Sequence, residues 1–190
     1  FIMSFILSFT NFNILSPDTK FVGLDNYVKL FTQDKLFLKS LFVTFKFAFI
    51  SVPLRLIFAL FVAMILNRKS RAVPVYRVVY YLPSIIGGSV AVSVMWRNLF
   101  TKSGVLNSIL QAMGINCKIN WLGNTDTAIY VLILLYVWQF GSSMLIFLSG
   151  LKQISTSYYE AAEVDGAGKI RMFFSITLPL LSPIILFNLI

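Results

Sequence analysis

The sequence predicts an all-α, polytopic membrane protein, and three observations support this prediction. Hydrophobic residues make up 58% of the 190 residues, and the mean hydropathy is +0.83. Charged residues make up 12%, roughly half the share found in an average soluble domain. Several apolar stretches reach about 20 residues, the length at which a helix crosses the hydrocarbon core of a bilayer. A soluble domain of this composition would expose large apolar patches to water.

Five stretches have the composition of membrane spans. The most apolar covers residues 127–151 and contains no charged residue, and two more cover about 40–66 and 78–100. Residues 1–12 and 177–190 have the composition of partial spans. The first of these lacks the basic n-region of a signal peptide. We therefore expect a piece of a longer polytopic protein.

The basic residues next to these spans predict their orientation. The connection 67–77 carries no acid and four basic residues, namely Arg68, Lys69, Arg71 and Arg77. The positive-inside rule places it in the cytoplasm. Alternation of the spans then places 152–176 inside, and 13–39 and 101–126 outside. The inner segments hold seven Lys and Arg residues and the longer outer segments six, so the bias is modest.

The outer segments contain apolar residues at helical spacing. This spacing predicts two short amphipathic helices, which either lie in the membrane interface or pack on the ends of the spans. The residues of the first are Leu24, Tyr27, Val28 and Phe31, and those of the second are Val105, Leu106, Ile109, Leu110 and Met113.

Two cations lie inside an expected span. A charge within a span is costly and indicates a polar pathway or a subunit contact. Arg55, near the middle of 40–66 and just after Pro53, is the stronger candidate for such a role. Lys46 lies about two turns from the outer end, from which its ammonium group can reach the interface.

Missing residue types exclude several kinds of chemistry. The chain has no histidine, so it offers no Ser-His or Cys-His catalytic pair and no imidazole metal ligand. Its single cysteine, Cys117, excludes an internal disulfide and a thiolate cluster. The net charge is +9, but the basic residues are scattered among apolar ones, which argues against nucleic acid as a partner. We expect no catalytic residue and no metal site in this chain.

The cytoplasmic segment 152–176 has the most specific local pattern. Ser157 and Glu160 fit the S-x-x-E capping box, which predicts a helix over Tyr158–Asp165. Gly166 allows the positive φ that ends such a helix, and a second helix is expected two residues later. A short, exposed helix–turn–helix of this kind fits a groove on another protein.

The same segment carries a resemblance to a known family. Glu160-Ala161-Ala162, then Gly166, then Ile176-x-Leu178-Pro179 are spaced as in the EAA signature, so the chain resembles the permease subunits of ATP-binding-cassette importers. The fuller run resembles the carbohydrate-uptake branch, of the maltose and glycerol-3-phosphate type. Other matching pieces are Phe21-Val22-Gly23-Leu24-Asp25-Asn26-Tyr27, Leu66-Asn67-Arg68, Tyr80-Tyr81-Leu82-Pro83 and Phe147-Leu148-x-Gly150-Leu151. One departure is Ser155, where the family usually has proline, and it is expected to loosen the start of the helix.

The resemblance implies an architecture and a set of partners. Residues 1–190 would form a single transmembrane permease domain of the type I importer (MetI-like) fold, with 152–176 as its cytoplasmic coupling loop. The partners would be a second permease subunit, a pair of ATPase subunits, an extracytoplasmic solute-binding protein and the lipid bilayer. ATP and Mg²⁺ would bind to the partner ATPase and no cofactor to this chain. The location would be the plasma membrane of a bacterium or archaeon, crossed several times.

Two sets of candidate site residues follow from the resemblance and from local chemistry. The set implied for ATPase coupling is Glu160, Ala161, Ala162, Asp165, Gly166 and Ala167. On local chemistry alone, the carboxylates of this set are solvated surface charges. The set for the substrate path combines aromatic and hydrogen-bonding side chains, as sugar sites do: Trp138, Gln139, Ser142, Ser89 and Arg55. In the alternative interpretation, the small residues near Ser142 only permit close helix packing.

Two other functions are weighed against an importer subunit. A self-sufficient secondary transporter or channel would need an ion-coupling carboxylate in a span, and none of the seven acids lies in one. A membrane enzyme would need a nucleophile motif, and this chain lacks one. Gly166-Ala167-Gly168-Lys169 resembles the end of a phosphate-binding loop, but Glu163 and Ile170 stand where that motif has Gly and Ser or Thr.

Overall fold

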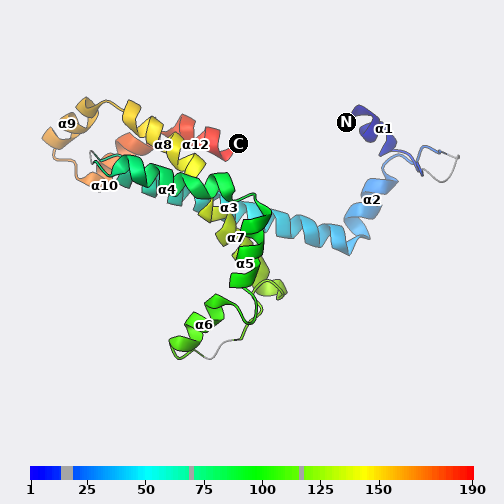
Figure 1. The fold of residues 1–190 in the computed structure, drawn as a ribbon. Coiled ribbons are helices and arrows are strands. Elements are labelled where there is room, and N and C mark those ends of the chain that lie inside the picture. Colours follow the sequence, from blue (N-terminus) through cyan, green and yellow to red (C-terminus); the bar gives the residue numbers. More distant parts are fainter. Residues whose placement is uncertain (14–18, 69–70, 116–117) are drawn as a thin grey trace. The chain divides into compact units, whose positions relative to one another are not determined.

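The computed structural model describes residues 1–13, 19–68, 71–115 and 118–190 (Figure 1). The expectations for Lys69 and Cys117 lie outside these residues. Within the described part, the regular elements are helices, and Thr10 and Phe21 form an isolated antiparallel bridge. The predicted all-α class is confirmed.

The chain divides into two compact units, Phe1–Ala48 and Phe49–Ile190. In the first unit, helix α1 covers Ile2–Leu7 and α2 covers Asp25–Thr32. The segment after α1 is attached to α2 by hydrogen bonds. The amide of Asn26 donates to the carbonyls of Ser8 (2.8 Å) and Thr10 (3.0 Å).

Residues 1–12 are therefore not helical throughout, as a partial span would require. The helix ends at Leu7, because the hydroxyls of Ser8 and Thr10 donate back to the carbonyls of Phe5 and Leu7 and the chain turns there. The first predicted amphipathic helix is found as α2. Leu24 lies just before this helix, and Leu24, Val28 and Phe31 are all more than half exposed.

Helix α3 covers Lys35–Leu66 and is the longest element. It begins five residues before the expected span 40–66, because Oδ1 of Asp34 accepts hydrogen bonds from the amides of Leu36 (2.9 Å) and Phe37 (3.0 Å). Among the described residues, α3 is the one helix that is long and apolar enough to cross a membrane by itself. Three bent helix pairs meet the same test only when each pair is taken together.

The expected span 78–100 is one of these bent pairs. Helix α4 (Val73–Ile86) and helix α5 (Val90–Leu99) meet at an angle of 96°. The stretch is helical but bent, and its two helices reach the length and hydropathy of a span only when they are taken together. The glycines Gly87 and Gly88 weaken a helix, and Ser89 has an extended backbone and accepts the amide of Val92 on its hydroxyl (3.3 Å), which starts a new helix.

The expected span 127–151 is also interrupted. Helix α7 (Thr125–Trp138) and helix α8 (Gly141–Gln153) meet at 44°, with Gln139 and Phe140 between them. Between α5 and α7, helix α6 (Val105–Ala112) corresponds to the second predicted amphipathic helix. Its Asn107 is buried and accepts a hydrogen bond from the indole of Trp121 (2.9 Å).

The last part of the chain consists of short helical pieces. They are α9 (Thr156–Val164), α10 (Lys169–Met172), the π-helical turn η1 (Phe173–Thr177), α11 (Leu178–Leu180) and α12 (Ser182–Leu189). The stretch Lys169–Leu180 and α12 form the third bent pair, at 62°. The expected partial span 177–190 is therefore helical with a bend at Leu181, just before Ser182-Pro183.

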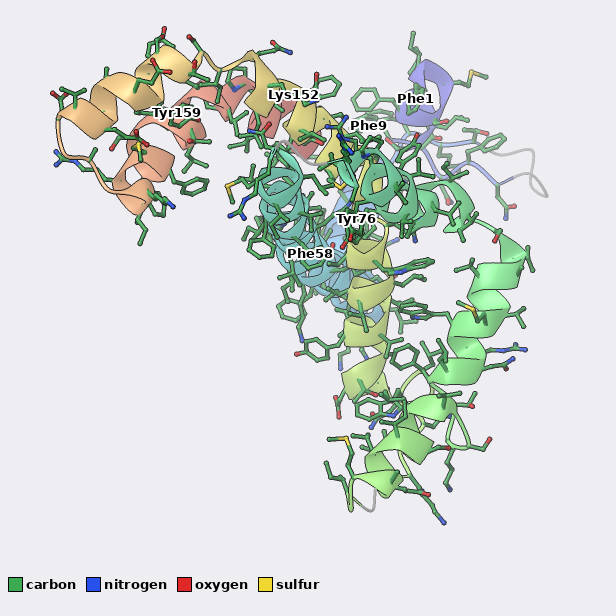
Figure 2. The ribbon with its side chains drawn as sticks, turned by 60° about the vertical axis from the view of Figure 1, so that its left-hand side comes forward. Phe1, Phe9, Phe58, Tyr76, Lys152 and Tyr159 are labelled. Carbon is green, nitrogen blue, oxygen red and sulfur yellow. The ribbon has the colours of Figure 1, made fainter. Side chains whose placement is uncertain are left out.

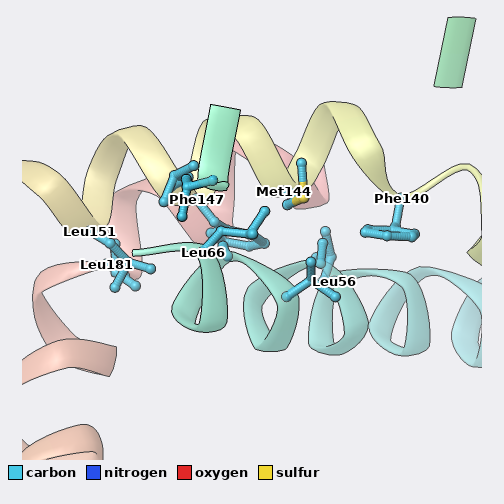
Figure 3. Packing of buried hydrophobic residues seen from close by; sticks show 12 residues of the cluster. Leu56, Leu66, Phe140, Met144, Phe147, Leu151 and Leu181 are labelled. Atoms are coloured by element: carbon cyan, nitrogen blue, oxygen red, sulfur yellow. The ribbon is translucent and has the colours of Figure 1, made fainter. Parts of the chain in front are cut away.

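The core of the second unit lies between α3 and α8 (Figure 3). Met144, Phe147 and Leu151 of α8 face Leu56 and Leu66 of α3, and Leu181 completes the cluster. Small residues bring further helices close to α8. A Cβ at Gly141 would collide with the backbone of α4, and one at Gly150 would collide with Ile184 of α12.

Candidate functional site

The segment predicted to couple the chain to a partner forms a helical hairpin, made of α9, a turn and α10. Ser155 is the N-cap of α9, and its hydroxyl accepts a hydrogen bond from the amide of Ser157 (3.3 Å). The predicted capping box on Ser157 and Glu160 was therefore wrong, because the N-cap lies two residues earlier than Ser157. The residue that departs from the family's proline supplies the cap itself, because a serine with an extended backbone places its hydroxyl over the free amides of the first turn.

The turn of the hairpin forms at the predicted glycine. Gly166 has a φ of +76°. Its amide donates to the carbonyl of Glu163 (3.0 Å), and the amide of Ala167 donates to that of Ala162 (2.8 Å). These two bonds make a Schellman motif, in which a left-handed residue closes the end of a helix. A Cβ at Gly166 would meet nothing within 4 Å, so glycine is required here by its backbone angle and not by space.

The two arms of the hairpin present apolar side chains to their surroundings. Tyr158, Val164 and Ile170 are more than half exposed, and Val164 is 89% exposed. Glu160 and Ala161 are exposed on the same helix. Tyr159 instead points back toward the span, where its hydroxyl lies 2.9 Å from that of Thr177 in η1. The hairpin is thus attached to the following helix and leaves an apolar surface uncovered.

A second group of candidate residues lies where the helices break. The carbonyl of Gln139, at the break between α7 and α8, accepts a hydrogen bond from the hydroxyl of Ser84 in α4 (3.0 Å). The same hydroxyl accepts one from the amide of Ser142 (3.1 Å). Ser84 therefore satisfies two backbone groups that the break leaves free. A Cβ at Gly87 would collide with the side chain of Gln139, so this amide side chain lies against α4.

Arg55 of α3 joins this group through its guanidinium. Its Nη2 donates to the hydroxyl of Ser142 (3.1 Å), and its Cζ lies 4.7 Å from the ring centre of Tyr136. The contact with the ring is a cation–π interaction, which compensates part of the cost of removing a cation from water. Within the part of the chain that the structure describes, Nε of Arg55 is buried without a hydrogen-bond partner.

The structure thus brings some of the predicted path residues together and separates others. Arg55, Gln139 and Ser142 share one hydrogen-bonded group, and the ring of Trp138 lies tilted against that of Trp96 of α5, with ring centres 5.7 Å apart. Ser89 instead caps α5 with its hydroxyl. Sequence reasoning missed Ser84. The sequence feature that could have indicated it is its position: Ser84 is a small polar residue one turn before Gly87, on the same face of an apolar helix.

Comparison with known proteins places the chain in context. A family model described as "Binding-protein-dependent transport system inner membrane component" matches residues 30–190. The chain is 55% identical over 187 residues to the probable ABC transporter permease protein YesP of Bacillus subtilis, covering 98% of this chain and 60% of that protein. It is 36% identical over 176 residues to the trehalose/maltose transport system permease protein MalF of Thermococcus litoralis, covering 92% of this chain and 59% of that one.

A third relative and a solved structure agree with these matches. The sn-glycerol-3-phosphate transport system permease protein UgpA of Yersinia pestis is 36% identical over 174 residues, covering 90% of this chain and 58% of that one. The structure of a bacterial ABC transporter involved in the import of the acidic polysaccharide alginate matches 97% of this chain and 62% of that chain, with a TM-score of 0.77 and 23% identity. The chain spans about three fifths of the length of the curated relatives it matches.

Proposed function

This chain belongs to the family of binding-protein-dependent transport system inner membrane components, and on that premise we propose that it is the membrane-spanning permease subunit of an ATP-driven importer of a sugar or sugar-like solute. The relatives named for trehalose and maltose and for sn-glycerol-3-phosphate support this class of solute. The observation that carries the proposal is the exposed hairpin, whose Gly166 turn and uncovered apolar residues suit docking on another subunit.

In this proposal the hairpin transmits the movement of a partner ATPase to the spans. The coupling residues are Glu160, Ala161, Ala162, Asp165, Gly166 and Ala167. The small side chains of the alanines permit close approach of the ATPase groove, and the carboxylate of Glu160 makes polar contacts there. The bond between Tyr159 and Thr177 supports transmission, because it connects α9 to the helix that follows. Rigid-body movement of the spans would then expose the path to one side of the membrane at a time.

ATP binds to the partner and not to this chain. A phosphate-binding loop follows a buried strand and precedes a long helix. Gly166-Ala167-Gly168-Lys169 follows helix α9 and precedes the four-residue helix α10, which supports our assignment of ATP hydrolysis to the ATPase subunits. The permease is therefore a subunit without a catalytic site of its own.

The solute path passes the helix breaks. Substrate sites in transporters are often built where helices are discontinuous, because free backbone groups and polar side chains meet there. In this proposal Arg55, Trp138, Gln139 and Ser142 line the path, and the hydrogen bonds at the helix breaks support it. Ser89, the N-cap of α5, is the remaining candidate. A second permease subunit would complete the path. A solute-binding protein would deliver the solute, as the structure of the alginate transporter with a "pentasaccharide-bound periplasmic protein" illustrates for that transporter.

One substitution tests the coupling role directly. We expect Gly166→Arg in the complete importer to leave the protein in the membrane but to abolish ATP-dependent solute uptake, because it strains the turn and places a large side chain on the docking surface. A matched control is Gly114→Arg, which has a similar φ of +84° and open surroundings but lies outside the hairpin. Both carry a comparable backbone penalty of about 1–2 kcal/mol. Normal uptake by Gly166→Arg, or equal loss in the control, would falsify the coupling assignment.

A further inference from the structure

A hollow of about 560 Å³ lies among the ends of the apolar helices of the second unit. Its lining comes from the residues just after α3, the first turns of α4, the end of α8 with the residue that follows it, and the start of α9. Three lining residues are basic, namely Arg68, Arg77 and Lys152, and none of the lining residues is acidic. We refer to this hollow as the basic pocket; Lys152 and Tyr159, two of its lining residues, are labelled in Figure 2.

Within the described part of the chain, no acidic residue lines the basic pocket to compensate its positive charge. Among the residues that the structure describes, no ion pair involves Arg68, Arg77 or Lys152. Nε of Arg77 is buried and has no hydrogen-bond partner in that part of the chain. A buried donor without a partner is unfavourable, and it is satisfied when an acceptor enters. The pocket therefore suits an anionic group with several acceptor oxygens, such as a phosphate.

The rest of the lining favours a phosphate carried by a lipid over a free phosphate ion. Val73 and Leu151 are buried and Ile154 is half-buried, so apolar surface lies beside the basic groups. The pocket also lies where α3 and α8 end and α4 begins, which is the depth of the head groups for helices that cross a bilayer. A free ion gains nothing from the apolar surface. The glycerol and the first methylene groups of a lipid, in contrast, make favourable contacts with it.

We propose that the basic pocket binds the phosphate head group of an anionic phospholipid. The three basic side chains hold the phosphate, and the apolar residues contact the start of the acyl chains. Basic pockets between the cytoplasmic ends of membrane helices recognise such head groups. This proposal does not depend on which solute is imported, because it concerns only the membrane in which the chain is embedded.

The test uses the complete importer complex, purified in detergent and stripped of lipid. Its thermal unfolding is followed while phosphatidylglycerol, phosphatidylcholine or inorganic phosphate is added separately. We expect protection by phosphatidylglycerol alone. In the double variant Arg77→Gln/Lys152→Gln, the affinity for phosphatidylglycerol should fall about 30-fold, because each basic side chain near an anionic membrane surface contributes about fivefold.

The matched control removes the same charge elsewhere. Lys29→Gln/Lys102→Gln lies outside both the basic pocket and the hairpin, and it should change the affinity less than threefold. If the double pocket variant does not assemble, Lys152→Gln decides alone, since this side chain is exposed and should lower the affinity about fivefold. Arg77→Lys, which keeps the charge, should restore most of the binding.

Three results would overturn the proposal. The first is equal protection by phosphatidylcholine. The second is equal protection by inorganic phosphate, which would make the ligand a free ion. The third is loss of the ATPase subunit from the pocket variant with lipid protection unchanged, which would assign the pocket to an acidic segment of that protein.

Discussion

At the residue scale, Arg55 is the side chain whose environment departs most from ordinary membrane chemistry. A cation inside an apolar helix is retained only where partners compensate its desolvation. Here the partners are the hydroxyl of Ser142 and the ring of Tyr136, which both come from the interrupted pair α7 and α8. The compensation depends on the break, because a hydroxyl at the first turn of α8 and a ring at the last turn of α7 reach the same guanidinium from two directions.

We predict a measurable coupling energy between Arg55 and Ser142. In the detergent-purified complex, Arg55→Gln and Ser142→Ala should each lower the free energy of unfolding. The double variant should be less destabilised than the sum by about 1 kcal/mol, as found for groups in direct contact. Thermal unfolding of the four proteins of the cycle measures this. The adjacent Ser143, which is buried, supplies the control, since Arg55→Gln and Ser143→Ala should be additive. Additivity in the Ser142 cycle would contradict the hydrogen bond.

Single residues were predictable where one backbone angle or one motif decides the outcome. Gly166 was such a case, because only glycine adopts a positive φ without strain and the turn follows directly. Ser84 was not, because its two hydrogen bonds reach backbone atoms more than 50 residues away, and no local pattern reports them. The cap of α9 was misplaced for a related reason. Two serines, Ser155 and Ser157, both suit the position, and the backbone angle of Ser155 decides between them.

At the scale of the elements, hydropathy located the apolar stretches but not their bends. Hydropathy predicted spans over 78–100 and 127–151 without their bends, because the average composition of a window carries no information on the direction of the helix axis. Each break has a local signal that was present in the sequence. Gly87-Gly88-Ser89 offers weak helix formers and then a cap, and Gln139-Phe140-Gly141 ends in the glycine that allows α8 to lie against α4.

The start of α9 gives a prediction at the same scale. Because Ser155 caps this helix, Ser155→Ala should weaken its first turn by about 1 kcal/mol and raise the hydrogen-exchange rate of the Ser157 amide about fivefold. Ser157→Ala removes only the contact between the two hydroxyls (2.8 Å) and should change the rate less than twofold. Mass-spectrometric exchange on the purified complex distinguishes them. A larger effect of Ser157→Ala would restore the capping box that the sequence suggested.

At the scale of the whole molecule, the residue types that the chain lacks and the places where its polar groups lie fit one proposed function. The chain has no histidine and no acid inside an expected span, and its distinctive groups lie at the hairpin, the helix breaks and the basic pocket. The importer subunit that we propose would need groups of these kinds, because it would provide a path and receive its energy from another protein. The family was predictable, because the spacing of Glu160, Gly166 and Pro179 is long and specific. The polar group at the breaks was not, because it depends on contacts among α3, α4, α7 and α8.

The orientation of the chain yields the last prediction, and the density of basic residues supports it. Positive charge is retained on the cytoplasmic side during insertion, so the basic connection 67–77 should lie inside. Alternation of the spans places the hairpin on the same side of the membrane as this connection. In a Cys117→Ser background, Lys169→Cys should react with a membrane-impermeant maleimide only after the cells are opened, whereas Lys102→Cys should react in intact cells. Both positions are exposed and basic, so they are matched in chemistry and differ in the side expected for them. Labelling of the hairpin cysteine in intact cells would place the docking surface outside, where no ATPase could reach it, and the importer proposal would fail with it.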